Sequence, residues 1–519
     1  MMGMKKKLLL GYLIIAFLAI FMHYKTIYDE IIKPPSDKWS KEVEISKAKS
    51  KSYPKVLKMG ENYLIAFDDG QNINLVTIDK LGNKIKEKSI DAMDEMVRSL
   101  SLITDGKNIY LSWIISNSGV KSLIQAKLDG NFNVLNTNQY FNVYDSAQIG
   151  DNAIAISTID RIEILDVKNN KKYTINENRA THLAGAEANG KIMISYLIGE
   201  NEFKYATIDD GEVKAEYIGT VGKGVFDSFG DVALSFDKNY GYLLVENKVK
   251  GQFGNIIAIV FNLDGSNYNI SKLKVGYIRY LYNPQTVSAG EGAVFVAGSE
   301  RKVGKKDEQY DIVEFLMDGE EIKEYNYVSK TSKPSMMPYY YDNYVAFADY
   351  LGDGVYKINL TSSTDEFKGI HNKVRPIERL EAFYKTFITI INSLFYIFIY
   401  GISWIFVGLL LVSIFMFFQY SLKDSKKLLT FILIYLITFI AKIYTVYRIS
   451  YITFGNLLPS YMANVLIGIL INIIISLLTL KHGYDDYKNN IFESPFMPFS
   501  KALVIDTFLT QLIFVPFII

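Results

Sequence analysis

The chain has 519 residues, of which 49% are hydrophobic and 21% are charged, and its formal net charge is +1. This length exceeds what one core serves and predicts two or more structural units, while the near-neutral charge argues against a nucleic-acid partner. The absence of cysteine excludes disulfides, thiolate catalysis and cysteine-ligated zinc or iron–sulfur sites.

The N-terminus has the pattern of a membrane-targeting segment. Lys5, Lys6 and Lys7 precede an uncharged run from Leu8 to Met22. This run is short for a membrane span, for which ~20 residues are typical, and its length also fits a cleaved signal peptide. Because no small-x-small site ends the run, we favour an uncleaved signal anchor over residues 1–25. The lysines predict a cytoplasmic N-terminus and export of the chain that follows.

A linker is predicted over residues 26–40. It contains Pro34 and Pro35, and consecutive prolines favour an extended polyproline-like conformation. We expect this segment to act as a spacer between the anchor and the next domain.

A short alternating apolar strand recurs seven times within residues 41–364, with successive copies beginning 39 to 52 residues apart. A period of about 40 to 50 residues built only of strands is typical of β-propeller blades. The sequence therefore predicts an all-β propeller of about seven four-stranded blades, with six or eight blades as the alternative because the fifth and sixth repeats are longer. The copies begin at Asn62, Asn108, Asn152, Lys191, Tyr240, Gly292 and Asn343.

Each of the first six repeats also carries a tight turn rich in Asp, Gly and Asn. These residues form hairpin turns readily, because Gly adopts positive φ at little cost and Asp caps its own turn. We interpret them as turns between the two outer strands of a blade rather than calcium loops, whose ligand pattern they lack. The turns lie at Asp79–Asn83, Asp129–Asn131, Asp166–Asn170, Asp209–Gly211, Asp264–Ser266 and Asp318–Gly319.

The seventh repeat is one strand short, and a segment near the N-terminus has the pattern to complete it. Glu42 to Ile45 alternates with period two directly after the predicted linker. As the outermost strand of the last blade, this segment would remove a free sheet edge and close the ring.

The chain beyond the repeats becomes charged and then apolar. Residues 365–382 predict a linker or an amphipathic helix at the membrane surface, because Val374, Ile377, Leu380 and Phe383 recur at helical spacing. Residues 383–519 predict a helical membrane domain with four spans, which makes five with the N-terminal anchor. The four spans lie near 395–419, 428–447, 461–480 and 501–519.

The lysines near the third span set the expected topology. Lys423, Lys426 and Lys427 fall in a loop that would be cytoplasmic if the repeats are extracytoplasmic, as the positive-inside rule requires. We therefore predict a multi-pass protein of the cell membrane with a cytoplasmic N-terminus and an extracytoplasmic propeller.

Three polar residues in the spans are candidate functional residues, because ionisable groups inside a bilayer are costly. Asp506 and Gln511 belong to the last span, and Lys442 lies near the outer end of an earlier one, where it could snorkel. We expect them to form a polar seam, with plain hydrogen bonding between helices as the alternative.

No catalytic residue, metal site or cofactor is predicted. His182 is the one histidine within the repeats, and no hydrolase, metalloprotease, phosphate-loop or dinucleotide motif occurs. An enzyme would require His182 and carboxylates to converge in the central channel.

Two clusters are candidate ligand contacts in the propeller. Tyr339, Tyr340 and Tyr341 form the densest aromatic cluster, and tyrosines on a rigid rim suit peptides or glycans. They would otherwise cover the joint between the first and last blades. Arg301 and Lys302, together with Lys305 and Lys306, are expected at a basic hairpin tip. This tip could meet an anionic polymer or lipid, or it could simply be solvated.

The sequence thus favours a non-enzymatic integral membrane protein that presents a propeller for a protein or cell-envelope ligand. Its expected partners are the lipid bilayer and an envelope or membrane protein. The alternatives are a membrane sensor or transport accessory protein in which the propeller regulates the helices, and an extracytoplasmic propeller enzyme.

Overall fold

The computed structural model describes residues 2–51, 53–93, 97–117, 119–222, 224, 226–303, 307–489 and 491–518. Two compact units share the chain. The propeller unit comprises Pro34–Val303 and Asp307–Lys373, and the helical unit comprises Met1–Lys33 and Val374–Ile519.

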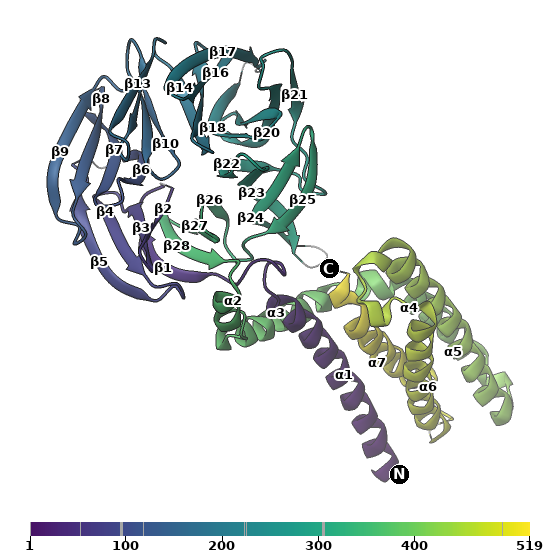
Figure 1. Ribbon diagram of the computed structural model, residues 1–519. Coiled ribbons are helices and arrows are strands. Elements are labelled where there is room, and N and C mark those ends of the chain that lie inside the picture. Colours follow the sequence, from purple (N-terminus) through teal and green to yellow (C-terminus); the bar gives the residue numbers. More distant parts are fainter. Residues whose placement is uncertain are drawn as a thin grey trace. The chain divides into compact units, whose positions relative to one another are not determined.

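The propeller unit contains seven four-stranded antiparallel sheets arranged around a centre (Figure 1), which confirms the predicted architecture. The innermost strands are β2, β6, β10, β14, β18, β22 and β26. From inside to outside, the blades are β2 (Lys55–Met59), β3 (Asn62–Asp68), β4 (Asn72–Ile78), β5 (Lys84–Asp91); β6 (Arg98–Thr104), β7 (Ile109–Asn117), β8 (Val120–Leu128), β9 (Val134–Phe141); β10 (Asp145–Ile149), β11 (Ala153–Ser157), β12 (Ile162–Asp166), β13 (Lys171–Ile175); β14 (Thr181–Ala188), β15 (Lys191–Ile198), β16 (Glu202–Asp209), β17 (Glu212–Thr220); β18 (Asp227–Phe236), β19 (Tyr240–Val249), β20 (Gln252–Asn262), β21 (Tyr268–Lys272); β22 (Leu281–Ser288), β23 (Ala293–Val303), β24 (Asp307–Asp318), β25 (Glu321–Tyr327); and β26 (Ser335–Tyr341), β27 (Tyr344–Gly352), β28 (Val355–Ser362), β1 (Val43–Ala48).

The repeated apolar strand of the sequence is the second strand of each blade. In β11 all five residues are buried, because neighbouring blades cover both faces of the sheet. The outermost strand β5 is mostly exposed and correspondingly rich in lysine. The predicted Asp-rich turns join the third and fourth strands, as expected. The Asp79 carboxylate, for example, accepts hydrogen bonds from the backbone N–H groups of Leu81 and Asn83.

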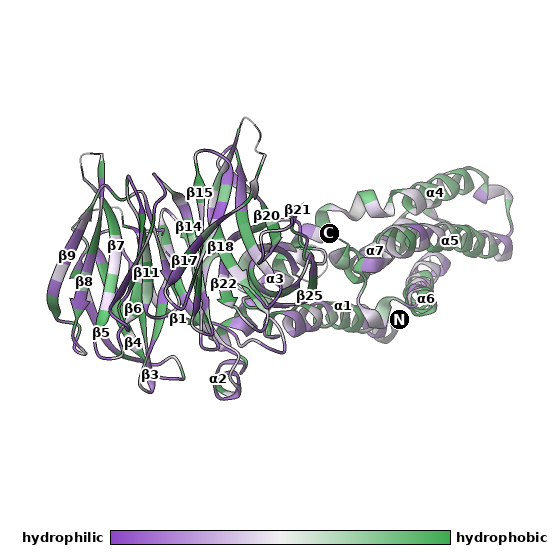
Figure 2. Cartoon of the chain, turned by 45° about the horizontal axis from the view of Figure 1, so that its top comes forward, coloured by the Kyte–Doolittle hydropathy of each residue, from purple (hydrophilic) through white to green (hydrophobic). Residues whose placement is uncertain are grey.

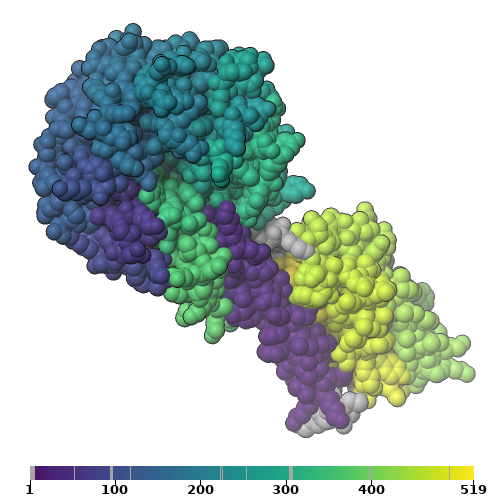
Figure 3. Space-filling model, viewed as in Figure 1, coloured from purple at the N-terminus to yellow at the C-terminus, as the bar shows by residue number. Residues whose placement is uncertain are grey.

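The ring is closed by the strand predicted for that role. β1 pairs antiparallel with β28 and is the outermost strand of the seventh blade, with Val43 opposite Leu360 and Ala48 opposite Tyr356. In the space-filling view, the purple N-terminal residues of the propeller lie directly beside the green residues of the last blade (Figure 3). Because the chain continues from β1 into the first blade, the pairing of β1 with β28 ties the first blade to the last.

The segment before β1 is packed rather than free, which corrects the predicted spacer over residues 26–40. Trp39 is fully buried, and its indole Nε1 donates to Glu314 Oε2 at 3.1 Å. Ser36 donates to the backbone oxygen of Tyr327 at 2.7 Å. Burial of a tryptophan outweighs the tendency of the two prolines to keep the chain extended in solvent.

The segment after β28 is packed as well. The short helix α2 (Asp365–His371) buries Phe367 against the first and last blades. His371 Nε2 lies 2.8 Å from the backbone oxygen of Leu81, and the Lys41 backbone N–H donates to Asn372 Oδ1 at 2.9 Å. Both ends of the propeller unit are thus held at the closing blade.

The helical unit contains five helices that are long and apolar enough to cross a membrane, within the part of the chain that the structure describes. Figure 2 shows the apolar colouring along α4 and α5. The helices of this unit are α1 (Met2–Ile31), α3 (Pro376–Phe395), α4 (Ile397–Phe418), α5 (Asp424–Val446), α6 (Val465–Asn489) and α7 (Phe496–Phe514), with short 3-10 or π segments at Gln419–Ser421, Tyr447–Thr453, Gly455–Leu457, Ser460–Met462 and Val515–Phe517.

The apolar stretch from Phe383 to Phe418 forms two helices, α3 and α4, which are separated at Tyr396. The side chains of α3 are distributed in the opposite way to those of an amphipathic helix on a water-soluble protein. The small or hydroxylated residues Ala382 and Thr386 of α3 are buried, whereas large apolar residues such as Phe383 are exposed. A helix with this distribution suits an apolar surrounding along its outer face.

Candidate functional site

The centre of the propeller is lined by the seven innermost strands, and five of them carry a β-bulge. The bulges lie in β6, β14, β18, β22 and β26. Ser99, His182, Asn283 and Met337, within four of these bulges, have φ between 47° and 53°. A bulge re-aims the side chains that follow it, and bulges of this kind are concentrated near functional sites.

The inner strands enclose a cavity of about 830 Å³ to which every blade contributes. Ligand pockets in proteins commonly have volumes of roughly 300–1,000 Å³. The lining mixes phenols, amides, hydroxyls and charges of both signs. Its chemically prominent members are Lys51, Tyr53, Lys55, Lys58, Arg98, Asp145, Gln148, Asp151, His182, Glu187, Asp231, Gln285, Tyr339, Tyr341 and Asp342.

One hydrogen-bonded group joins the first blade to the fifth across this cavity. The Tyr53 hydroxyl donates to Asp231 Oδ2 at 2.6 Å, and Asn283 Nδ2 donates to the same oxygen at 2.6 Å. Glu246, which is fully buried behind them, accepts from the Asp231 backbone N–H and pairs with Lys248. Burial raises the pKa of Glu246, and the Asp231 charge adds to that rise. Burial followed by the Asp231 charge also raises the pKa of Tyr53 well above its usual value.

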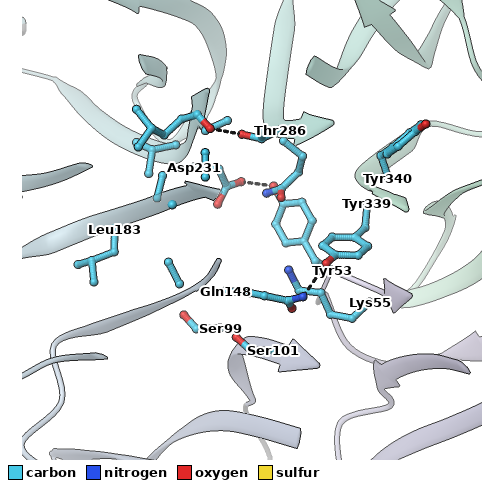
Figure 4. Close-up of a pocket in the computed structure, with 18 of the residues that line it drawn as sticks. Tyr53, Lys55, Ser99, Ser101, Gln148, Leu183, Asp231, Thr286, Tyr339 and Tyr340 are labelled. Carbon is cyan, nitrogen blue, oxygen red and sulfur yellow. Dashed lines mark hydrogen bonds between the residues drawn. The ribbon is translucent and has the colours of Figure 1, made fainter. Parts of the chain in front are cut away.

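A second group joins the seventh blade to the third. Gln148 Nε2 donates to the Tyr339 hydroxyl at 2.8 Å, and Gln148 Oε1 accepts from the backbone N–H of Leu102. The Lys55 ammonium lies over the Tyr339 ring, 4.2 Å from its centroid, and Figure 4 shows these side chains close together. Burial lowers the pKa of Lys55 to about 8, although the charge of Asp231 opposes this effect.

The three predicted tyrosines do not share one role. Tyr339 and Tyr341 both reach the third blade, since the Tyr341 hydroxyl donates to Asp151 Oδ2 at 2.8 Å. Tyr340 projects away from the cavity centre (Figure 4), and its ring packs edge-on against Trp39. All three tyrosines therefore belong to the innermost strand β26, but only Tyr339 and Tyr341 reach across the central cavity. The cross-channel partners could not be predicted from the sequence, because they belong to blades far apart in the chain.

His182 and several carboxylates also meet in this cavity. Asp145 Oδ2 accepts from the backbone N–H of Leu183 at 2.9 Å, and burial raises the pKa of Asp145. The ring nitrogens of His182 lie 3.1 Å from Thr181 Oγ1 and 3.3 Å from the Phe229 backbone oxygen. His182 and Asp145 thus line one cavity, with each side chain already held by neighbours.

The predicted basic pair on β23 lies apart from the cavity, and Arg301 is not at a solvated tip. Arg301 is 8% exposed, and its guanidinium lies over the Tyr327 ring, donates to the Ser329 backbone oxygen and faces Asp311. The hairpin is longer than expected, so that Arg301 falls inside the sheet, while Lys302 is exposed. Lys305 and Lys306 fall outside the described residues.

The polar residues of the helical unit divide into two groups. Lys442 does not snorkel: its Nζ lies 2.7 Å from Asp506 Oδ1, and the side chains are 2% and 3% exposed. Ser476 and Thr479 of α6 donate to Asp506 Oδ2 at 2.6 Å and 3.1 Å. Gln511 belongs to a separate contact, because its amide donates to the backbone oxygen of Ser393 on α3. Ser476 and Thr479 are three residues apart on α6, and this spacing of two hydroxyls was a sequence signal for the polar group around Asp506.

Among the described residues, no group of three or more histidine, aspartate or glutamate side chains could hold a metal ion. No protein-family model matches the chain, and no curated protein sequence matches it.

Several solved structures match the chain at low identity. They include the β-propeller domain of the Trilobed protease from Pyrococcus furiosus (12% identity, TM-score 0.37, covering 62% of this chain and 99% of that one). A post-proline cleaving enzyme from Rickettsia typhi matches with 13% identity and a TM-score of 0.32, covering 63% of this chain and 57% of that one. The Synechocystis apocarotenoid oxygenase mutant Trp149Ala matches with 11% identity and a TM-score of 0.33, covering 57% and 74%. These likenesses concern the fold alone.

Proposed function

We propose that this chain is a membrane-anchored binding protein whose propeller holds a cell-envelope ligand in its central cavity. The carrying observation is the convergence, from all seven blades, of polar and aromatic side chains on one cavity of about 830 Å³. The strand bulges that aim these side chains support a built site, because each bulge disrupts regular strand pairing for no gain in sheet stability. The proposed ligand contacts are Tyr339 and Tyr341, together with Tyr53 and Lys55.

Site-specific photocrosslinking tests this assignment in cells that make the full-length chain. A photoreactive residue at Ser288, which is exposed and lines the cavity, is compared with one at Thr137, which is exposed on the outer strand β9. We expect an envelope component to be captured from Ser288 and not from Thr137. Capture only from Thr137, or equally from both positions, would place the ligand elsewhere and overturn the proposal.

The proposed topology has the N-terminus in the cytoplasm and the propeller outside it. The lysines at the N-terminus and those at the start of α5, Lys423, Lys426 and Lys427, support this orientation by the positive-inside rule. The chain has no cysteine, so single cysteines at Thr137 and at the exposed Lys426 can be read without background. We expect a membrane-impermeant maleimide to label T137C in intact cells and to label K426C only after the cells are opened. The reverse pattern would exclude this orientation.

An extracytoplasmic enzyme is the second candidate, because His182 and Asp145 line the same cavity. A neutral imidazole and a carboxylate are the usual groups for acid–base work. The test is incubation of the component captured at Ser288 with wild-type protein and with H182N. A product that forms with the wild type and is lost with H182N would favour the enzyme. Recovery of the component unchanged from both would favour the binding protein.

A further inference from the structure

Four of the carboxylates around the cavity, those of Asp145, Asp151, Asp231 and Asp342, already have donors within the protein. Asp231 accepts from Tyr53 and Asn283, and Asp145 accepts from two backbone N–H groups, those of Ser146 and Leu183. Asp151 accepts from Tyr341, and Asp342 pairs with Lys58 at the edge of the cavity. A bound cation would have to compete with these donors for the same oxygen atoms.

The Lys55 ammonium is in the opposite position. No described residue forms an ion pair or a hydrogen bond with it. The ammonium lies over the face of the Tyr339 ring, and the charge of Asp231 favours its charged form. A ring face attracts a cation but satisfies none of its three N–H donors. Leaving a partly buried ammonium without an acceptor is costly, so the cavity holds an unsatisfied positive charge.

We propose that Lys55 binds an oxyanion, a carboxylate or phosphate group, of the ligand that enters the propeller cavity. This inference rests on the proposed function of the cavity and names the chemistry that the ligand must carry. The ligand supplies the acceptor oxygens that the protein does not, while the Tyr339 ring forms one wall beneath the ammonium. Gln148 fixes that wall by its hydrogen bond to the Tyr339 hydroxyl.

Other polar groups of the cavity suit the remainder of such a ligand. Gln285, Thr286 and Ser101 also line the cavity. Hydroxyls and carboxamides both donate and accept, which matches the hydroxyl groups of a saccharide. Acidic saccharides and phosphate-bearing polymers share this combination of an oxyanion with hydroxyls, so a carboxylate probe and a phosphate probe distinguish the two sources.

The test measures binding to the full-length chain in detergent by calorimetry, with three probes. Glucuronate carries a carboxylate, glucose is its uncharged counterpart, and inorganic phosphate represents the second source. We expect glucuronate or phosphate to bind and glucose to bind at least about tenfold more weakly, since a hydrogen bond to a charged group is worth that much. The anion that binds better identifies the source.

Three variants locate the effect. K55M removes the charge with little change in length, and we expect it to weaken anion binding about tenfold or more. K55R keeps the charge and should stay within a few-fold of the wild type. K250M is the matched control, because Lys250 also lies over an aromatic ring, that of Phe226, but is exposed outside the cavity. Thermal unfolding of each variant shows whether it is folded.

Anion binding by K55M at wild-type affinity would overturn the inference, and so would equal binding of glucose and glucuronate. Failure of both anions to bind the wild type would also count against it. If capture at Ser288 persists in that case, the cavity remains the binding site and only the oxyanion assignment is wrong. Loss of capture at Ser288 in the wild type would remove the proposed function itself.

Discussion

Gln148 of the third blade and Tyr339 of the seventh blade are joined across the propeller by a hydrogen bond of 2.8 Å. Blades three and seven are not neighbours in the ring, so this bond spans the channel rather than a blade interface. Tyr53 and Asp231 make a similar connection between blades one and five. The centre of the propeller is therefore crossed by side chains from opposite sides. These side chains shape the cavity and hold the Tyr339 ring in place as one of its walls.

The bond between Gln148 and Tyr339 should contribute measurably to stability. We expect Y339F to lower the free energy of unfolding of the propeller by about 1 kcal/mol, because the partly buried amide of Gln148 loses one acceptor. Combination with Q148A should show a coupling energy of similar size in a double-mutant cycle. Chemical unfolding of the full-length chain measures both values. Y277F serves as the control, since Tyr277 is fully exposed; zero coupling would mean that the bond does not form in solution.

Trp39 should act as the N-terminal anchor of the propeller. We expect W39A to destabilise the propeller by about 3–5 kcal/mol, because a fully buried indole leaves a cavity when it is removed. W39F should lose less, since it retains most of the apolar contact. Thermal unfolding and limited proteolysis at residues 34–40 measure the effect. If W39A and the wild type were equally stable and equally resistant, the segment would be a free spacer after all.

The stability of the propeller should fall as the pH rises from about 4 to about 7. Burial raises the pKa of Asp311 to about 7 from its usual 3.8, against the opposing effect of Arg301 and of hydrogen bonds from Ser329 and Thr331. The folded state therefore binds a proton that the unfolded state releases in this range. The stabilisation by protonated Asp311 is fully present below the lower of these two pKa values and is lost as the pH rises through the higher one. For this one group, the slope of the unfolding free energy against pH is at most about 1.4 kcal/mol per pH unit.

Substitution of Asp311 identifies the source of that slope. D311N should flatten the dependence of unfolding free energy on pH between 4 and 7, as measured by denaturation at a series of pH values. Asp349, whose pKa burial raises to about 6, accounts for part of the remainder. D264N is the control, because the pKa of this exposed turn carboxylate is lowered and titrates below the range. An unchanged slope in D311N would assign the effect to other groups.

The buried pair of Lys442 and Asp506 should hold α5 to α7. We expect K442M or D506N alone to destabilise the detergent-solubilised helical unit by about 3–5 kcal/mol, since each leaves an unpaired partner in an apolar interior. The double variant K442M/D506L should recover much of that loss. Thermal unfolding followed by helix content measures the three proteins. Single variants as stable as the wild type would show that water or lipid reaches the pair.

Local sequence patterns explain why much of the fold was predictable. The period of the strand beginning at Asn62 and the turn at Asp79 depend on residues within one blade, where alternation and turn chemistry act locally. The same alternation identified Glu42 to Ile45 as the missing strand, because one incomplete blade has only one kind of partner that completes it, and the structure places this strand at Val43–Ala48. Apolar runs likewise gave the number of long helices, although the break at Tyr396 was not foreseen.

The sequence by itself determined the seven blades, the closing strand and the five long apolar helices. Each of these features depends on a pattern of apolar residues that are close together in the chain. Only the tertiary structure decided that Tyr339 meets Gln148, that Lys55 has no hydrogen-bond acceptor among the described residues and that Lys442 meets Asp506. These relationships join residues far apart in the chain, and each depends on the direction in which a strand bulge or helix face points its side chain. Local pattern carries no information about such directions until the ring and the bundle are assembled.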